Sequence, residues 1–252
     1  METMKDLLKQ ASENAGFVLG FFLVIVAVFA LAYVAEVLIQ KRKGVKEKIF
    51  TTRKVAMIGM FSAISGILMF FEFAVPMIAP PFYELDFSEL PVLICGFAFG
   101  PAAGVMAEFL KVLIKLFLKS TSTAFVGDLA NFVVGCTMIL PATIIYQIKK
   151  SKSGAIIACV VGTICMAGFG TAFNAIYLIP AFAELYGMPL EAIIGMGTKI
   201  NAAIDDIVSF VIICVAPLNI IKGTMISVLT MLVYKPLSPI IKAGQRSGSS
   251  KK

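Results

Sequence analysis

The residues best able to do chemistry lie inside a long apolar run from 207 to 234. Asn219 and Lys222 are its strongest polar side chains, and their spacing of three puts them one turn apart on the same face of a helix. Asn offers a donor and an acceptor together, whereas Lys offers donors only. Such a pair suits a planar ligand edge on which carbonyls alternate with ring N–H groups. An interhelical hydrogen bond, combined with an ion pair from Lys222 to Glu108 or Asp128, would satisfy the same residues.

Placing a charged side chain at the centre of a membrane helix costs about 2.5–3.5 kcal/mol of insertion free energy, so polar side chains in apolar segments usually face a cavity or a partner. These candidates are Glu108, Lys111, Asp128, Asn131 and Asn174. Lys111, Lys115 and Lys119 recur every four residues and therefore share a helix face, with Glu108 one turn before Lys111. The lysines form either a protein-facing stripe whose outermost member extends to the interface, or a cationic wall for an anionic substrate group.

Composition predicts an integral membrane protein. Apolar residues make up 59% of the 252 residues and charged residues only 15%, and the mean hydropathy is +0.95. One soluble core could not bury so much apolar surface, whereas stretches of about 20 apolar residues match the length of a membrane-spanning helix. The first stretch, from about residue 15, is too long for a signal-peptide core and is expected to be retained.

The inventory of reactive residues excludes several kinds of site. Histidine is absent, and the five cysteines lie in apolar segments without metal-ligand spacing. We therefore expect no metal site, no histidine base, and cysteines that act as buried apolar side chains. The net charge of +7 does not indicate nucleic-acid binding, because the basic residues flank the apolar segments instead of forming a patch on a soluble domain.

The apolar segments predict membrane helices at about 16–40, 54–79, 89–100, 101–119, 125–148, 154–179 and 206–234. Basic residues gather at 41–54, 149–152 and 235–252, which fall on one side when the helices are counted. That side is predicted to be cytoplasmic, with the C-terminus inside and the N-terminus outside. The acidic stretch from Glu72 to Glu89 would then lie outside, and the loop 180–205 would contain a short helix.

Two further features concern helix packing. Small residues that share a face of the second predicted helix are Ala56, Gly59, Ala63 and Gly66. They would let another helix approach closely, either inside the bundle or from a separate subunit. Pro217 is expected to free a carbonyl and kink the last helix.

The chain has no phosphate-binding loop and no internal repeat, so active transport would need an energy source on a partner or an ion gradient.

Five sequence blocks occur in the order M-F-S-A-I-S-G-I-L-M, F-Y-E-L-D-F-S-E-L-P, F-G-P-A-A-G-V-M-A-E-F-L-K, A-N-F-V-V-G and A-P-L-N-I-I-K-G. Together they resemble the riboflavin-binding S component of energy-coupling factor (ECF) transporters, over roughly Ala56 to Tyr234. The second and last blocks are specific in combination, and any one block alone would be weak.

The resemblance implies a six-helix bundle that binds riboflavin from outside and docks to a transmembrane coupling subunit and two cytoplasmic ATPases. It implies no cofactor and no enzymatic activity. The implied flavin contacts are Asn174, Asn219 and Lys222, and the outer loop with Tyr83, Leu85 and Phe87 would cover the pocket. Lys222 would donate to the carbonyl-rich pyrimidine edge. The small face of Ala56, Gly59, Ala63 and Gly66 would meet the coupling subunit.

The chain departs from the family pattern at the extra helix near 16–40 and in a longer loop from Pro180 to Asp205. We therefore expect an all-α multi-pass protein of the cell membrane: an additional N-terminal transmembrane helix with a basic cytoplasmic linker (1–45), the six-helix substrate-binding domain (46–240) and a disordered basic tail (241–252). A free-standing secondary carrier for a planar vitamin is the alternative, followed by a membrane-embedded enzyme using Asp128, Glu108 and lysines.

Overall fold

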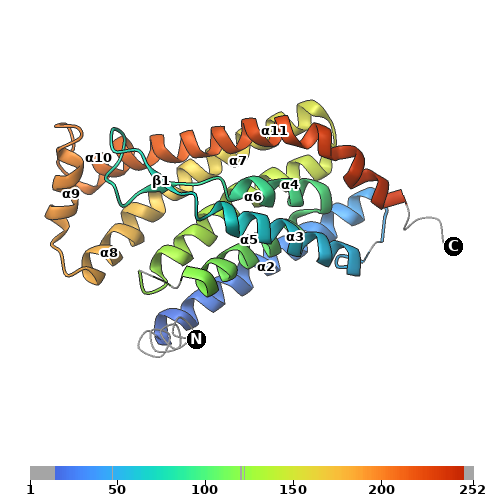
Figure 1. The fold of residues 1–252 in the computed structure, drawn as a ribbon, viewed down its shortest axis with the longest axis horizontal. Helices are drawn as coiled ribbons and strands as arrows, with labels where there is room; N and C mark the ends of the chain where they lie inside the picture. Colours follow the sequence, from blue (N-terminus) through green and yellow to red (C-terminus); the bar gives the residue numbers. More distant parts are fainter. Residues whose placement is uncertain (1–14, 47, 120, 122, 247–252) are drawn as a thin grey trace.

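The computed structural model describes residues 15–46, 48–119, 121 and 123–246, and this part is almost entirely helical (Figure 1). The helices are α2 (Ala15–Lys43), α3 (Thr52–Leu68), α4 (Glu89–Phe99), α5 (Pro101–Lys119), α6 (Val126–Ile148), α7 (Lys152–Phe173), α8 (Ile179–Leu185), α9 (Leu190–Thr198), α10 (Ile207–Phe210) and α11 (Ala216–Arg246). Two π-helical turns, η1 (Asn174–Leu178) and η2 (Val211–Val215), join α7 to α8 and α10 to α11. The strands β1 (Phe73–Ala74) and β2 (Glu84–Leu85) form one short antiparallel pair.

Four helical segments among the described residues are long and apolar enough to cross a membrane: Val18–Lys43, Val126–Ile148, Lys152–Leu185 and Ile207–Tyr234. The remaining helices of the bundle are α3 and α4, which are shorter, and α5, which carries four charged residues. In Figure 1 the strand pair and α8 to α10 lie at one end of the bundle, and the C-terminal end of α11 lies at the other. The predicted all-α architecture, a six-helix bundle plus an N-terminal helix, is confirmed.

The predicted helix 54–79 was too long, because α3 ends at Leu68 and the chain then turns into the strand pair. Pro76, Pro80 and Pro81 lie in the following segment, and each lacks the N–H that a continued helix needs. At the other end of the chain, α11 continues to Arg246 and so enters the segment predicted as a disordered tail. The rest of that tail, 247–252, lies outside the described residues.

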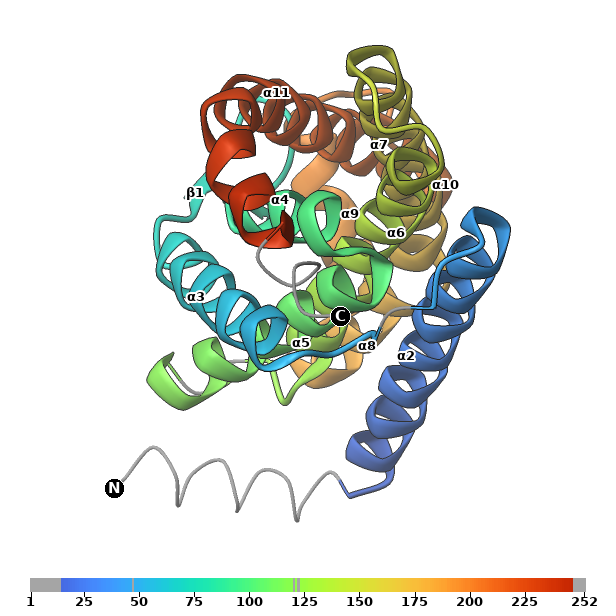
Figure 2. The same ribbon diagram turned by 90° about the vertical axis from the view of Figure 1, so that its right-hand side faces the viewer.

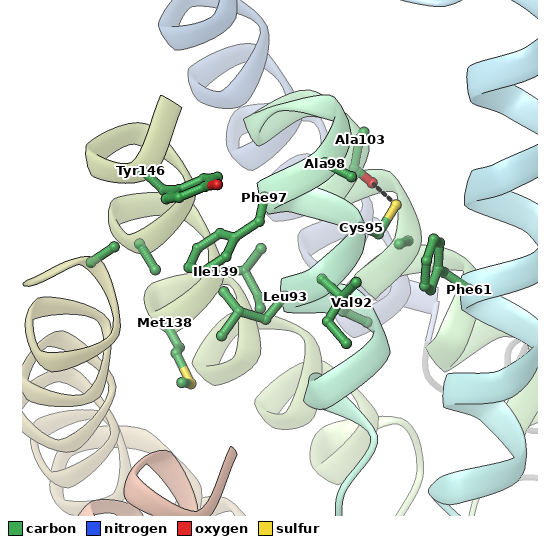
Figure 3. Close-up of a cluster of buried hydrophobic side chains, with 14 of the residues drawn as sticks. Phe61, Val92, Leu93, Cys95, Phe97, Ala98, Ala103, Met138, Ile139 and Tyr146 are labelled. Carbon is green, nitrogen blue, oxygen red and sulfur yellow. Dashed lines mark hydrogen bonds between the residues drawn. The ribbon is translucent and has the colours of Figure 1, made fainter. Parts of the chain in front are cut away.

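The main core surrounds α4, whose side chains are buried on nearly every side (Figure 3). Phe97 of α4 stacks on Tyr146 of α6 at a centroid separation of 4.4 Å, and the Tyr146 hydroxyl is 2.8 Å from that of Tyr234 on α11. The Cys95 thiol donates a weak hydrogen bond to the Ala103 carbonyl. All five cysteines are free and all but Cys165 are buried, so the expectation of buried apolar cysteines is confirmed for four of the five.

The extra N-terminal helix α2 packs on the outer side of α5 and α6 (Figure 2). Aromatic contacts join Phe21 to Phe132 of α6 and Phe29 to Phe109 of α5. The buried Glu36 carboxylate accepts a hydrogen bond from the Ala102 N–H, which is otherwise without an intrahelical partner because it lies in the first turn of α5. The helix is therefore fixed to the bundle by a polar contact as well as by apolar packing.

Candidate functional site

The asparagines predicted to contact a ligand come together around Gly170 of α7. Asn174 Nδ2 donates to the Gly170 carbonyl at 2.7 Å. A Cβ placed on Gly170 would lie 2.9 Å from Asn219 Nδ2 on α11. The amides of Asn174 and Asn219 therefore both reach the same short stretch of α7. The structure thus brings together two predicted site residues that are far apart in the sequence.

Each of these helices contains a π turn just before a proline. The turn η1 begins at Asn174 and ends two residues before Pro180, and η2 ends two residues before Pro217. A proline cannot donate to the carbonyl four residues back and its ring crowds that carbonyl, and a π turn supplies one extra residue that accommodates both effects. The expected distortion near Pro217 therefore takes the form of a π turn. Such turns are frequent at functional sites.

Lys222 is held by two carboxylates from the segment that follows β2. Its Nζ lies 3.1 Å from Asp86 Oδ2 and 2.9 Å from Glu89 Oε1. The other Asp86 oxygen accepts the Ser88 N–H at 2.7 Å, which fixes the loop just before α4. The alternative ion pair considered from the sequence, between Lys222 and Glu108 or Asp128, is wrong. Neither reaches Lys222, because each is paired with a lysine of the α5 stripe instead.

The lysine stripe of α5 pairs with acids at three successive levels. Lys111 lies 2.6 Å from Glu108 Oε1 and 3.2 Å from Glu89 Oε1, and all three side chains are buried. Lys115 lies 2.6 Å from Asp128, and the outermost Lys119 reaches Glu72 at 2.5 Å. The stripe therefore faces protein at Lys111 and Lys115, while Lys119 is half-exposed, and the expected pair within α5 is confirmed. A cationic wall for an anionic substrate is not supported, since each of these lysines already has an acid partner.

The loop predicted to cover the pocket contributes its residues unequally. Tyr83 Oη donates to Asn174 Oδ1 at 2.6 Å, so this side chain closes directly over a predicted ligand contact. Leu85 is buried in an apolar cluster with Leu218 of α11. Phe87 instead packs against Phe73 and the main core. The structure brings Tyr83 and Leu85 to the candidate site, and Phe87 supports the loop from its other side.

Beside Tyr83 lies a small apolar cavity of about 200 Å³ between the loop and the helices α8 and α9. Its lining residues are Phe82, Ile179, Phe182, Tyr186, Met188 and Ile193. The volume is below the roughly 300–1,000 Å³ typical of pockets for small molecules. A planar ligand with several rings would therefore require this loop to move outward.

The small residues of α3 divide into two groups. Ala56, Gly59 and Ala63 are exposed, and nothing lies within 4 Å of a Cβ placed on Gly59. Gly66 is buried, and a Cβ there would lie 2.7 Å from Ile114 of α5. The face predicted to dock a subunit is thus open over its first three members, while Gly66 serves the packing of α3 on α5.

Sequence reasoning missed Asp86, Glu89 and Gly170 as members of the site. Asp86 and Glu89 belong to the F-Y-E-L-D-F-S-E-L-P block, where the excess of acids over bases was the available signal. Gly170 lies in an apolar segment, where a glycine by itself gives no signal of a binding site. Its position four residues before Asn174, one helical turn away, could have indicated a contact with that side chain.

Comparisons with known proteins agree with this architecture. The family model described as ECF transporter, substrate-specific component, matches residues 53–234. The chain is 35% identical over 190 residues to the riboflavin transporter RibU of Staphylococcus aureus (strain TCH60), covering 75% of this chain and 93% of that one. It is 28% identical to the riboflavin transporter FmnP of Bacillus subtilis (strain 168), covering 77% and 96%.

A solved structure of the S component of a bacterial ECF transporter superposes with a TM-score of 0.59 at 33% identity, covering 75% of this chain and 98% of that chain. The matched family is one of transport components, not of enzymes. The match begins after α2, so the extra helix lies outside it. The bundle of α3 to α11 accounts for the matched region, and the chain belongs to the substrate-specific components of ECF transporters.

Proposed function

We propose that this chain is the riboflavin-binding membrane subunit of an ECF transporter. The observation that carries the proposal is the meeting of Asn174 and Asn219 at Gly170, with Tyr83 closing over Asn174 and Lys222 one helical turn from Asn219. Two asparagine amides supply mixed donors and acceptors, and the lysine supplies donors only. The pyrimidine edge of riboflavin presents the matching pattern of carbonyls and a ring N–H. The family membership and the names of the relatives support the same ligand.

Lys222 can serve the ligand without losing both of its acid partners. An ammonium group has three N–H donors, and Asp86 and Glu89 use two of them. The third is left for a flavin carbonyl. The carboxylates would then hold the lysine charged and oriented, so that little conformational freedom is lost when the ligand binds.

Entry of riboflavin requires the outer loop to open. Tyr83 Oη donates a hydrogen bond to Asn174 Oδ1, so this oxygen is already engaged. The adjacent cavity, of about 200 Å³, is small. Outward movement of residues 80–83 would release Asn174 and join the cavity to the amide cluster. Asp86 would keep its ion pair with Lys222. The apolar residues Phe82, Ile179 and Ile193 would then surround the dimethylbenzene end of the flavin.

Family membership supports a further set of assignments. We propose that residues 46–240 form the binding domain and that 1–45 form a separate helix and linker. Ala56, Gly59 and Ala63 would dock a transmembrane coupling subunit that works with two cytoplasmic ATPases. The basic end of the bundle, with the C-terminus, would be cytoplasmic, and the strand pair, α8 and α9 would face outside together with the N-terminus.

The test is a titration of the detergent-purified full chain with riboflavin, followed by quenching of flavin fluorescence. We expect saturation at one riboflavin per chain, and denaturing the protein purified from cells supplied with riboflavin should release a yellow ligand. A monodisperse protein that shows no saturable quenching would refute the flavin assignment. Uptake in cells that continues without any ATPase would refute the assignment to an ECF transporter even if riboflavin bound.

A further inference from the structure

A groove runs along the membrane-facing side of the bundle between α7 and α11. The helices touch where Gly223 meets Thr163, because a Cβ on Gly223 would lie 2.7 Å from Thr163 Cγ2. The Thr163 and Ser227 hydroxyls, 3.2 Å apart, also join them. Beyond this contact α11 turns toward α4 and α6, where Tyr234 meets Phe97 and Tyr146. Figure 2, which looks onto that end, shows the ends of α7 and α11 apart.

The groove has a volume of about 660 Å³ and is mainly aliphatic. Its lining residues are Lys152, Ile156, Cys159, Val160, Thr163, Ile164, Thr224, Ser227, Val228, Met231 and Leu232. The hydroxyl residues lie toward the closed end, and the wider end is lined by Ile156, Val160, Val228 and Leu232. From residue 152 to residue 163 the helix rises by roughly 16 Å, about half of the ~30 Å thickness of the hydrocarbon core. The groove is therefore about as long as one leaflet is thick.

Among the residues whose side chains the structure describes, a single charge lines the groove, and it stands at the open end. Lys152 is the first residue of α7, is exposed, and has no ion pair with any residue in the described part of the chain. Lys149 precedes it at the same end of the bundle. The first turn of α7 is already capped by the Ser151 side chain, which accepts the Gly154 N–H at 3.0 Å. What remains for a ligand is the lysine charge itself.

We propose that this groove binds an anionic phospholipid, with one acyl chain along the aliphatic wall and its headgroup phosphate beside Lys152. The charge favours an anionic headgroup over a zwitterionic one, and the length of the groove matches one leaflet. A partner helix fits the groove less well, because an apolar helix offers no anion to Lys152. This lipid site is separate from the candidate flavin site and does not depend on it.

The absence of tryptophan from the chain allows a direct test with one fluorescent reporter. Ile156→Trp places the reporter in the groove. Ile157→Trp is a matched control, because Ile157 is the next residue of α7, is equally exposed (47% against 48%), and does not line the groove. The full chain is reconstituted in phosphatidylcholine vesicles with a minor fraction of phosphatidylglycerol. Two preparations are compared. In one the phosphatidylglycerol carries dibrominated acyl chains, which quench tryptophan fluorescence, and in the other an equal fraction of the phosphatidylcholine carries them.

We expect brominated phosphatidylglycerol to quench the Ile156→Trp reporter more than an equal fraction of brominated phosphatidylcholine. A local enrichment of about fivefold would correspond to the roughly 1 kcal/mol contributed by one basic residue at an anionic surface. The Ile157→Trp reporter should show no preference. Adding Lys152→Gln should abolish the preference, while Lys152→Arg should keep it.

Circular dichroism and the riboflavin titration establish that each variant is folded. Equal quenching by the two lipids at Ile156, or a preference that survives Lys152→Gln, would overturn the proposal. If the groove instead serves to bind a helix of a partner subunit, the isolated chain should likewise show no headgroup preference, and the proposal would be overturned.

Discussion

Glu89 Oε1 lies 2.9 Å from Lys222 Nζ, and the same oxygen lies 3.2 Å from Lys111 Nζ. One carboxylate at the start of α4 therefore connects the lysine of the candidate flavin site to the lysine stripe of α5. The buried cluster contains three acids, Asp86, Glu89 and Glu108, but only two lysines. Because a buried charge without a partner is costly, the arrangement makes the fold sensitive to the loss of either lysine.

Replacing Lys222 with methionine should destabilise the ligand-free protein as well as weaken riboflavin binding. The substitution leaves three buried carboxylates with Lys111 alone, and removing one partner of a buried pair typically costs about 3–5 kcal/mol. The lost hydrogen bond to the flavin should lower affinity by roughly tenfold to a hundredfold. Thermal melting without ligand and the dissociation constant measure the two effects separately.

The control is the double variant Lys222→Met with Asp86→Asn, which removes one of the stranded charges. It should recover part of the melting temperature but none of the affinity. A melting temperature unchanged in Lys222→Met, together with unchanged affinity, would exclude both roles for this lysine.

Gly170→Ala should weaken riboflavin binding while leaving the bundle folded. The added Cβ would lie 2.9 Å from Asn219 Nδ2, so the amide must turn away from its present position. Loss of one well-placed hydrogen bond predicts a decrease in affinity of about threefold to tenfold. Fluorescence titration provides the measurement.

Gly168→Ala is the matched control, since it lies in the same helix and nothing is within 4 Å of a Cβ there. It should retain affinity and raise helix stability by up to about 1 kcal/mol. Equal affinity losses in the two variants would mean that α7, and not the asparagine cluster, is responsible.

Ala63→Leu should abolish cellular uptake of riboflavin and spare binding by the isolated protein. Ala63 is exposed on α3, so a larger side chain there would block a close helix contact with a separate subunit. Gly66→Leu should instead lower the melting temperature of the isolated chain, because Gly66 is buried against Ile114. If Ala63→Leu lowered binding and melting temperature as well, the exposed face would belong to internal packing.

Tyr83→Phe should speed riboflavin association. The phenol donates to Asn174 at 2.6 Å in the closed loop, and a hydrogen bond of this kind contributes about 0.5–1.5 kcal/mol. Removing it should accelerate loop opening by about twofold to tenfold, as followed by stopped-flow quenching. An association rate unaffected by Tyr83→Phe would show that this contact does not limit entry.

Local sequence determined the membrane class, most helices and several neighbour relationships. Hydropathy is a property of contiguous residues, so the apolar segments could be recognised one by one. Helical periodicity placed Asn219 beside Lys222 and predicted the pair between Glu108 and Lys111, which lie 2.6 Å apart. Pro217 likewise predicted a distortion of the last helix, and the structure places that distortion at η2. Each of these inferences involves residues within about one or two turns of each other.

Tertiary structure alone decided the partners of Lys222 and the meeting point of the asparagines. Asp86 and Glu89 are 136 and 133 residues from Lys222, and Gly170 contacts a side chain of a different helix. Such contacts depend on which segments fold against each other, and several acids in the sequence could have satisfied the same lysine. The contact of Gly66 with α5 was unpredictable for the same reason. A small residue permits close approach, but only the assembled bundle determines which helix approaches.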